Sequence, residues 1–159
     1  MPSSATHSLF GPREAAARFL TFTLGPTLYG VRVLQVREIM RLVPITFVAQ
    51  MPAYVRGVIN LRGVVVPVAD LRVRLGLPET NRLEDGCIVV ARIEGRDGRS
   101  RGLGLVVDTV EEVAQVAQDD VVEPPEFGAA VSTDHILGMA RIRDRVTTLL
   151  DLDHLFALE

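Results

Sequence analysis

The amino-acid sequence predicts an all-β protein with two small β-barrel subdomains that are related by an internal repeat. Short runs of β-branched and aromatic residues alternate with turns that contain glycine or proline, a pattern typical of small barrels rather than of parallel sheets. In addition, residues 55–77 align with residues 136–158 at a shift of 81 positions. Each segment predicts two strands followed by a capped helix, so short helices belong to the predicted fold.

The first half of the chain contains a hairpin, a helical turn and a second pair of strands. The runs "FLTFTL" and "LYGVRV" are joined by "GPT", which predicts a hairpin, and "VLQVREI" predicts a turn of helix. The strands "VRGVINLR" and "VVVPVADL" meet at Gly63. Because Pro67 donates no ladder hydrogen bond, we expect the second strand at a sheet edge or a bulge. Asp70 is the predicted N-cap of the helix "LRVRLGL", which ends at Gly76.

The second half follows a polar connector, "GLPETNRLEDG", which is the predicted boundary between the barrels. Its strands are predicted in "CIVVARI", "LGLVVDTV", "EEVAQV", "ILGMARIRD" and "RVTTLLDL", with an arginine-rich loop at 95–102. We therefore expect a first barrel over about residues 19–82, a second over about 83–150 and a C-terminal helix over about 151–158. Residues 1–16 form the expected flexible tail, and the folded domain covers the rest of the chain, 17–159.

The internal repeat places residues of the same type at matching positions in the two halves. At a shift of 81 positions the matched pairs are Gly57 with Gly138, Arg62 with Arg143, Asp70 with Asp151, and Leu71 with Leu152. At a shift of 74 positions they are Gly30 with Gly104, Val33 with Val107, Val36 with Val110, and Glu38 with Glu112. The difference between the two shifts must be accommodated in a loop. The repeat therefore predicts two similar β subdomains.

Composition argues against several classes of function. The net charge is −3 and the chain contains no lysine, which disfavours general nucleic-acid binding and excludes lysine-based phosphate loops and Schiff bases. The single cysteine, Cys87, is expected to be a small buried hydrophobe. The three histidines lie far apart in the sequence and predict no metal site (His7, His135 and His154). No catalytic set, cofactor motif, signal peptide or membrane span is recognisable, so we expect a cytoplasmic protein that is not an enzyme.

Arg62 interrupts an apolar strand, and periodicity places it on one face with Val58 and Asn60. A structural interpretation pairs its guanidinium with a carboxylate such as that of Glu38. A functional interpretation makes it a rim arginine at a protein interface, where bidentate pairing gives specificity. The two interpretations are compatible, because an ion pair can also hold the arginine in place for a partner.

The stretch "VRGVINLRGVVVPVADLR" closely resembles the signature of the CheW family, the adaptors of bacterial chemosensory arrays. The resemblance extends upstream through "FLTFTLGPTLYGVRVLQVREI" and downstream through "GLVVDTVEEV" and "ILGMARIRDRVTTLLDLDHL", from about Phe19 to Phe156. It implies two five-stranded barrels of the Src-homology-3-like type. It also implies an adaptor that joins the regulatory domain of the CheA histidine kinase to the cytoplasmic tips of chemoreceptors, the methyl-accepting chemotaxis proteins. Such an adaptor is recruited to receptor arrays at the inner face of the membrane without inserting into it.

The resemblance also implies a set of partner-binding positions. The positions associated with receptor coupling or kinase control are Val36, Glu38, Gly57 and Arg62. Two more positions belong to the same signature, Asn60 and Gly63. The positions that contribute to the groove between the barrels are Val110 and Val113. We expect Gly57→Asp and Arg62→Glu to leave the fold intact but to uncouple kinase from receptor. The 95–102 loop is longer than the family pattern, which leaves its contacts open.

Two alternatives remain open. A similar adaptor could serve another chemosensory pathway, such as twitching motility. A more remote alternative is a β-barrel that binds RNA or a small ligand, which predicts a basic face or a sizeable pocket. The same domain also ends the CheA kinase and is fused to a receiver in CheV proteins, and the length of this chain favours a stand-alone adaptor.

Overall fold

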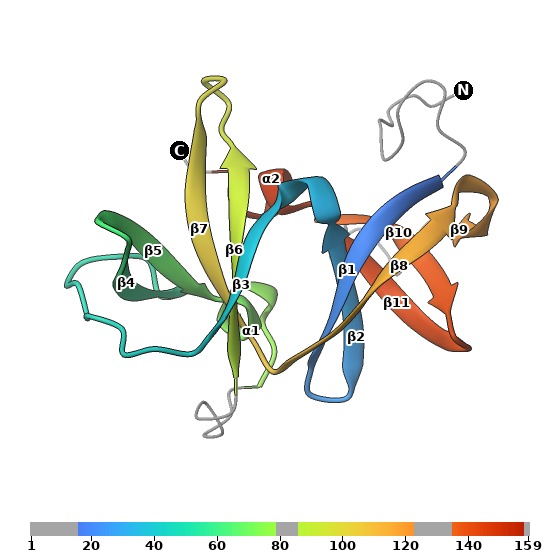
Figure 1. Cartoon of the computed structure of the whole chain (residues 1–159), viewed down its shortest axis with the longest axis horizontal. Helices are drawn as coiled ribbons and strands as arrows, with labels where there is room; N and C mark the ends of the chain where they lie inside the picture. The colour runs from blue at the N-terminus through green and yellow to red at the C-terminus, as the bar shows by residue number, and fades with distance from the viewer. Residues whose placement is uncertain (1–15, 79–85, 123–134, 158–159) are drawn as a thin grey trace.

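The computed structural model describes residues 16–78, 86–122 and 135–157, and these residues form two β-sheets that each curl into a barrel (Figure 1). The sheet that we call the first barrel has the strand order β3-β6-β7-β5-β4, and the second barrel has the order β8-β1-β2-β11-β10-β9. The predicted all-β, two-barrel fold class is therefore confirmed. The second barrel has six strands among the described residues instead of five, because the two-residue strand β9 pairs with β10.

The secondary-structure elements are short, and strands predominate among them. The strands are β1 (Ala16–Leu24), β2 (Thr27–Arg32), β3 (Val36–Arg41), β4 (Val55–Leu61), β5 (Val64–Asp70), β6 (Cys87–Glu94), β7 (Ser100–Val107), β8 (Thr109–Ala117), β9 (Val121–Val122), β10 (Ile136–Ile142) and β11 (Arg145–Leu150). The helices are α1 (Leu71–Leu75) and α2 (Leu152–Leu155), and a 3-10 turn at Val33–Gln35 replaces the helical turn predicted before β3.

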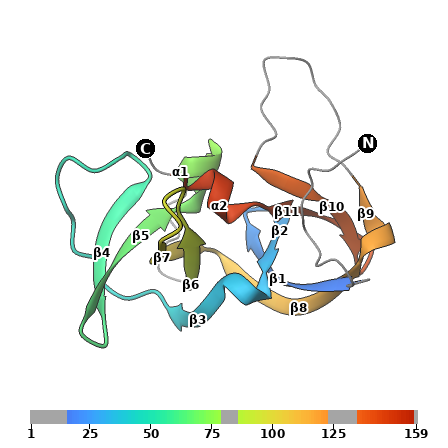
Figure 2. The ribbon, with the colours of Figure 1, turned by 90° about the horizontal axis from the view of Figure 1, so that it is seen from above.

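Each barrel is built from both halves of the chain, so the predicted boundaries of about 19–82 and 83–150 are wrong. The β1–β2 hairpin belongs to the second barrel, where β2 pairs in parallel with β11, and the β6–β7 hairpin belongs to the first, where β7 pairs in parallel with β5. Figures 1 and 2 show the two hairpins side by side between the outer strands of the two barrels. Local sequence patterns predict where strands form, but these parallel pairings join segments far apart in sequence.

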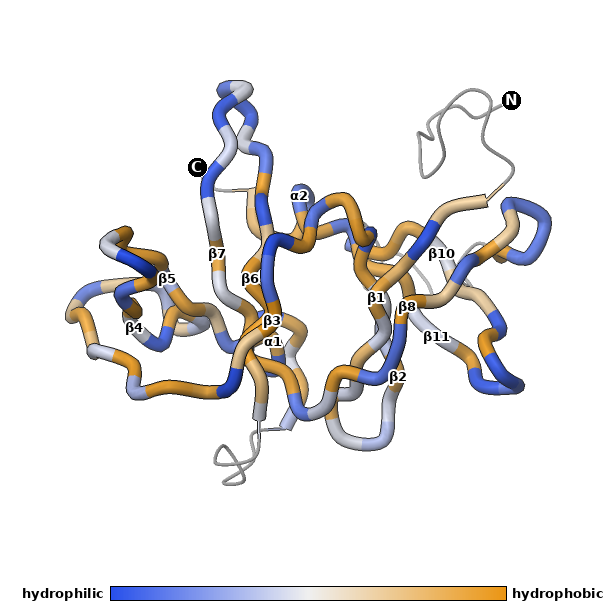
Figure 3. Tube along the Cα trace, viewed as in Figure 1, coloured by the Kyte–Doolittle hydropathy of each residue, from blue (hydrophilic) through white to orange (hydrophobic). Residues whose placement is uncertain are grey.

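This exchange explains why the hairpin strands are apolar on both faces. Along β1, Phe19 contributes to the core of the second barrel whereas its neighbour Leu20 contributes to a central core shared by both barrels. Along β6, Ile88 lies in the core of the first barrel and Val89 in the same central core. A strand buried on both faces appears in sequence as a continuous apolar run. Figure 3 shows hydrophilic residues gathered instead at the tips of the β6–β7 and β10–β11 hairpins.

The two helices begin as predicted. The Asp70 carboxylate accepts hydrogen bonds from the backbone N–H groups of Arg72 (2.9 Å) and Val73 (3.4 Å), and the Asp151 carboxylate accepts one from the N–H of His154 (3.1 Å). Gly76 ends α1 with a φ of 74°, a left-handed conformation that glycine adopts readily. The predicted C-terminal helix over 151–158 is found only as α2, which begins after its N-cap Asp151 and ends at Leu155, with Phe156 as its C-cap; residue 158 lies outside the described residues. The predicted tail at 1–16 also lies outside them, except for Ala16, which starts β1.

Of the two positions predicted for Pro67, the sheet edge is wrong, because β5 lies between β7 and β4. The β4–β5 pairing does have an irregularity beside Pro67, between Val55 and Gly57 on β4, opposite Ala69 and Val68. Residues Val68–Asp70 of β5 pair with β7, so Pro67 immediately precedes the β5–β7 ladder. Proline can therefore occupy an interior strand here, at a position where β7 offers no partner. Among the described residues, no helix is long and apolar enough to cross a membrane.

Candidate functional site

Arg62 lies in the turn between β4 and β5, not on a strand as the periodicity predicted. Leu61 pairs with Val64, which leaves Arg62 and Gly63 as a two-residue loop with φ values of 51° and 89°. Two consecutive positive φ values define a type I′ turn, whose twist matches that of the flanking strands. The Asn60 side-chain oxygen accepts a hydrogen bond from the N–H of Gly63 at 2.8 Å and so closes the turn. Asn60 and Gly63 thus hold Arg62 at the tip of the hairpin.

The predicted pairing of Arg62 with Glu38 is confirmed. The guanidinium donates through Nη2 to Oε1 at 2.5 Å and through Nη1 to Oε2 at 3.2 Å. Glu38 lies on β3, one edge of the first barrel's sheet, and Arg62 follows β4, the other edge, so this two-pronged contact joins the two edges. The Arg62 side chain is 72% exposed. Its hydrogen bond is the main cause that lowers the pKa of the Glu38 carboxylate, against a smaller effect of burial.

Exposed valines flank this ion pair at the start of β5. Val64 is 61% exposed and Val65 is 65% exposed. We call the tip formed by Glu38, Asn60, Arg62, Gly63, Val64 and Val65 the first hairpin face. Arginine is one of the residue types enriched at protein–protein hot spots.

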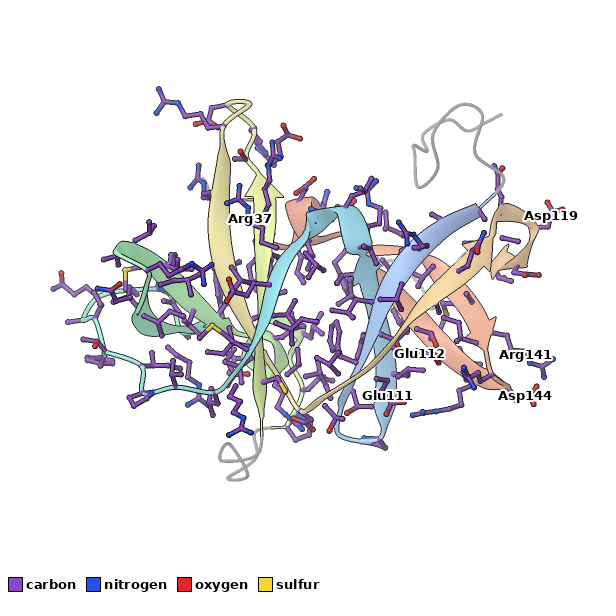
Figure 4. All side chains as sticks on the ribbon, viewed as in Figure 1. Arg37, Glu111, Glu112, Asp119, Arg141 and Asp144 are labelled. Carbon is purple, nitrogen blue, oxygen red and sulfur yellow. The ribbon has the colours of Figure 1, made fainter. Side chains whose placement is uncertain are left out.

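The second barrel repeats this arrangement at the matching positions. Arg143 and Asp144 form the turn between β10 and β11 with φ values of 51° and 66°, and Arg143 Nε lies 2.8 Å from Glu112 Oε2. Val146, the counterpart of Val65, is 63% exposed, and Val113 is 52% exposed. Figure 4 shows Glu111 and Glu112 on β8 and Asp144 at the far end of the β10–β11 hairpin. Glu112, Val113, Arg143, Asp144 and Val146 make up the second hairpin face.

Sequence reasoning missed this second face although the signal was present. The two repeat shifts match Arg143 to Arg62 and Glu112 to Glu38, so a predicted Arg62–Glu38 pair implies an Arg143–Glu112 pair. Of the residues implied by the resemblance, only Val113 lies on this face, whereas Glu38, Asn60, Arg62 and Gly63 meet on the first.

Gly57 has a structural role inside the first barrel. A Cβ built at this position would lie 2.0 Å from the carbonyl oxygen of Thr46, and the φ of Gly57 is 150°. That close approach lets Thr46 and Val58 exchange two backbone hydrogen bonds of 2.9 Å each, which attach the segment before β4 to the strand. No side chain fits at position 57 without displacing this backbone. The geometry therefore contradicts the expectation that Gly57→Asp leaves the fold intact.

Val36 and Val110 lie apart from both hairpin faces. Each is half-buried and packs against the central core between the barrels, Val36 from β3 and Val110 from β8. The internal repeat matches Val36 to Val110 at the shift of 74 positions, and both residues pack against the same core. They are thus positioned to support the region where the two barrels meet.

The site chemistry consists of ion pairs and apolar side chains. Within 16–78, 86–122 and 135–157, no group of three or more histidine, cysteine, aspartate or glutamate residues could hold a metal ion. Cys87, expected to be buried, is half-buried at the start of β6 and packs against the central core. The exposed arginine at the tip of each hairpin face is therefore paired with a glutamate and lies near exposed valines.

Comparison with known proteins identifies the relatives of this chain. The family model of the CheW-like domain matches residues 18–159. The chain is 32% identical over 159 residues to the chemotaxis protein CheW of Klebsiella aerogenes, covering 100% of this chain and 93% of that protein. It is 34% identical over 159 residues to the chemotaxis protein CheW of Rhizobium meliloti, with coverages of 100% and 97%. The crystal structure of the scaffolding protein TtCheW from Thermoanaerobacter tengcongensis aligns with a TM-score of 0.76 at 30% identity, over 90% of this chain and 94% of that one.

Proposed function

The chain belongs to the CheW-like domain family, and on that premise we propose that it is a non-enzymatic adaptor coupling chemoreceptors to a CheA-type histidine kinase. The observation that carries this proposal is the pair of equivalent ion-paired hairpin faces, one on each barrel. A scaffold needs more than one docking surface, and this chain has two hairpin faces of similar composition in addition to the region between the barrels. Its proposed location is the cytoplasm, at the receptor arrays on the inner face of the membrane.

The ion pair prepares each arginine for an interface. A free arginine loses side-chain entropy when a partner immobilises it, whereas Arg62 is already held by two hydrogen bonds to Glu38. Its remaining N–H donors are exposed and can bind carbonyl or carboxylate oxygens of a partner. The neighbouring valines add apolar area that becomes buried on contact.

The two faces lie at opposite ends of the molecule. The β4–β5 hairpin projects from one side and the β10–β11 hairpin from the other, in the perpendicular views of Figures 1 and 2. In our proposal the first hairpin face docks the regulatory domain of the kinase. The second face is available to another copy of that domain. The region between the barrels, near Val36 and Val110, then receives the helical tip of the receptor.

The test is co-sedimentation of the chain with a CheA-type kinase and a receptor cytoplasmic fragment assembled on lipid vesicles. Reversing one charge, in Arg62→Glu or Glu38→Arg, should deplete the kinase from the pellet, and the double reversal should recover part of it. Arg41→Glu is the matched control, because Arg41 is an exposed arginine on β3 outside the ion pair. Failure of the wild-type chain to sediment with either partner would refute the proposal. A gel shift with RNA at ~0.15 M salt, where electrostatic binding is weakened, tests the remote alternative.

A further inference from the structure

A polar hollow of about 350 Å³ lies where the two helices meet the tip of the β6–β7 hairpin. Its polar lining consists of Arg74 from α1, Arg96 from the hairpin tip, and His135 and His154, and its apolar lining consists of Leu75, Leu155 and Ala157. Among the described residues that line this hollow there is no aspartate or glutamate. Neither hairpin face contributes to it, so the docking proposal leaves this hollow unexplained.

Arg74 is fixed in place and still has donors to offer. Its Nε donates to the carbonyl oxygen of Leu155 at 2.9 Å, and its guanidinium carbon lies 5.6 Å from the centre of the Tyr54 ring. None of the ion pairs among the described residues involves Arg74 or Arg96. Within the described parts of the chain, two arginines outside any ion pair therefore line the same hollow, an arrangement that favours an anion.

A second hollow of about 390 Å³ continues the first and shares Arg96 and His154 with it. It contains Arg32, whose Nε is buried and has no hydrogen-bond partner among the described residues. A buried donor without an acceptor is unfavourable, and a ligand oxygen that reaches it would remove this cost.

Three carboxylates line this second hollow, and two of them are already engaged. Asp153 Oδ1 accepts from Gln35 Nε2 and from the N–H of Glu94, both at 2.9 Å. Asp151 caps α2, and the third carboxylate belongs to Glu94. The first hollow, which has no carboxylate among its described lining residues, is therefore the anion-binding end, and Arg32 is a further donor in the second hollow.

We propose that this double hollow binds a small polyvalent oxyanion ligand, whose phosphate or carboxylate groups contact Arg74 and Arg96. A volume of about 350 Å³ is within the range of roughly 300–1,000 Å³ found for small-molecule sites. The ligand would also bridge the barrels, since Arg74 and Arg96 follow strands of the first barrel and α2 follows β11 of the second. Because the hollow exists only in the folded chain, binding of the ligand stabilises the folded chain against heat.

The experiment titrates the full chain with inorganic pyrophosphate and, separately, with citrate, at ~0.15 M salt and matched ionic strength. Isothermal calorimetry gives the Kd, and differential scanning fluorimetry gives the Tm. At ten times the Kd, one-site binding should raise the Tm by about 3–6 °C. Arg96→Gln should weaken binding at least about tenfold, as expected for the loss of a charge-assisted contact. Because Arg96 is exposed and forms none of the ion pairs described, this variant is expected to fold normally.

Arg99→Gln is the matched control, because Arg99 is on the same hairpin and exposed but does not line either hollow. Equal losses in Arg96→Gln and Arg99→Gln would overturn the proposal, since they would indicate general screening of charge. So would the absence of heat and of any Tm rise with both anions at ~10 mM. A hexaglutamate peptide that binds where both small anions fail would also overturn it, by assigning the hollow to a partner's carboxylates. The assay uses the chain alone, so its failure leaves the adaptor function unaffected.

Discussion

Substitution of Gly57 by alanine should destabilise the first barrel far more than an ordinary glycine substitution. The added Cβ would lie 2.0 Å from the Thr46 oxygen, so the backbone of that segment must move and the two 2.9 Å hydrogen bonds to Val58 must break. Each bond contributes about 0.5–1.5 kcal/mol. A non-glycine residue at such a φ costs a further 1–3 kcal/mol or so. The expected loss is therefore about 2–6 kcal/mol, and a central value near 4 kcal/mol lowers the Tm by about 8–16 °C.

Thermal and urea unfolding measure this loss, and amide hydrogen exchange at Thr46 and Val58 localises it. Gly63→Ala is the matched control, because Gly63 also has a positive φ, 89°, but nothing lies within 4 Å of its added Cβ. It should lose only the conformational part, on the order of 1 kcal/mol. A Gly57→Ala variant whose Tm stays within about 2 °C of the wild type, or matches Gly63→Ala, would refute the reasoning.

Three further predictions concern a cap, an ion pair and the second hairpin face. Asp70→Ala should lower the free energy of unfolding by about 2–4 kcal/mol in urea denaturation, because Asp70 is buried, caps α1 and pairs with an arginine, whereas Asp151→Ala should cost about 1 kcal/mol. Arg62 lowers the pKa of Glu38 in the folded chain, so their pair adds stability above the unfolded-state value of 4.5 and loses it as the pH falls through the folded-state pKa. The Tm difference between wild type and Arg62→Gln should thus be constant near neutral pH and shrink in acid, and a difference that grows in acid would contradict this sign. Val113→Glu should leave the Tm nearly unchanged but weaken the second partner contact in co-sedimentation, and unaltered binding would exclude Val113 from that interface.

Much of the local structure could be predicted from the sequence, because it depends on short-range chemistry. The caps at Asp70 and Asp151 follow from an acidic residue before an apolar run, and α1 ends at Gly76 because glycine accepts a left-handed conformation. The Arg62–Glu38 pair also followed from the residue types, since an arginine in an apolar strand region requires a charged partner. These predictions were confirmed because the residue types alone are sufficient to define the contacts.

The remaining features depend on which distant segments meet. Nothing local distinguishes a β1–β2 hairpin that closes its own half from one that pairs with β11, so the barrel boundaries were wrong. The period-two pattern continued through Arg62 because a type I′ turn occupies only two residues and leaves the alternation on either side intact. The contact of Gly57 with Thr46 could not be predicted from local patterns, because the bridge between Thr46 and Val58 lies outside the regular strands.

The exchange of hairpins has a consequence for coupling. If each half of the chain formed its own barrel, the two barrels could move independently about the linker between them. A displacement of one hairpin face would then not displace the other. Instead, the central core combines residues of both barrels, and Asp108, at the crossing from β7 to β8, pairs with Arg72 and accepts the N–H of Gly25 at 2.7 Å. Arg74 adds a hydrogen bond to the carbonyl of Leu155. Displacing one barrel relative to the other would break this packing, so the two hairpin faces keep a fixed separation and orientation. Under the proposed function, the chain would therefore pass a change in receptor position to the kinase by moving as one body.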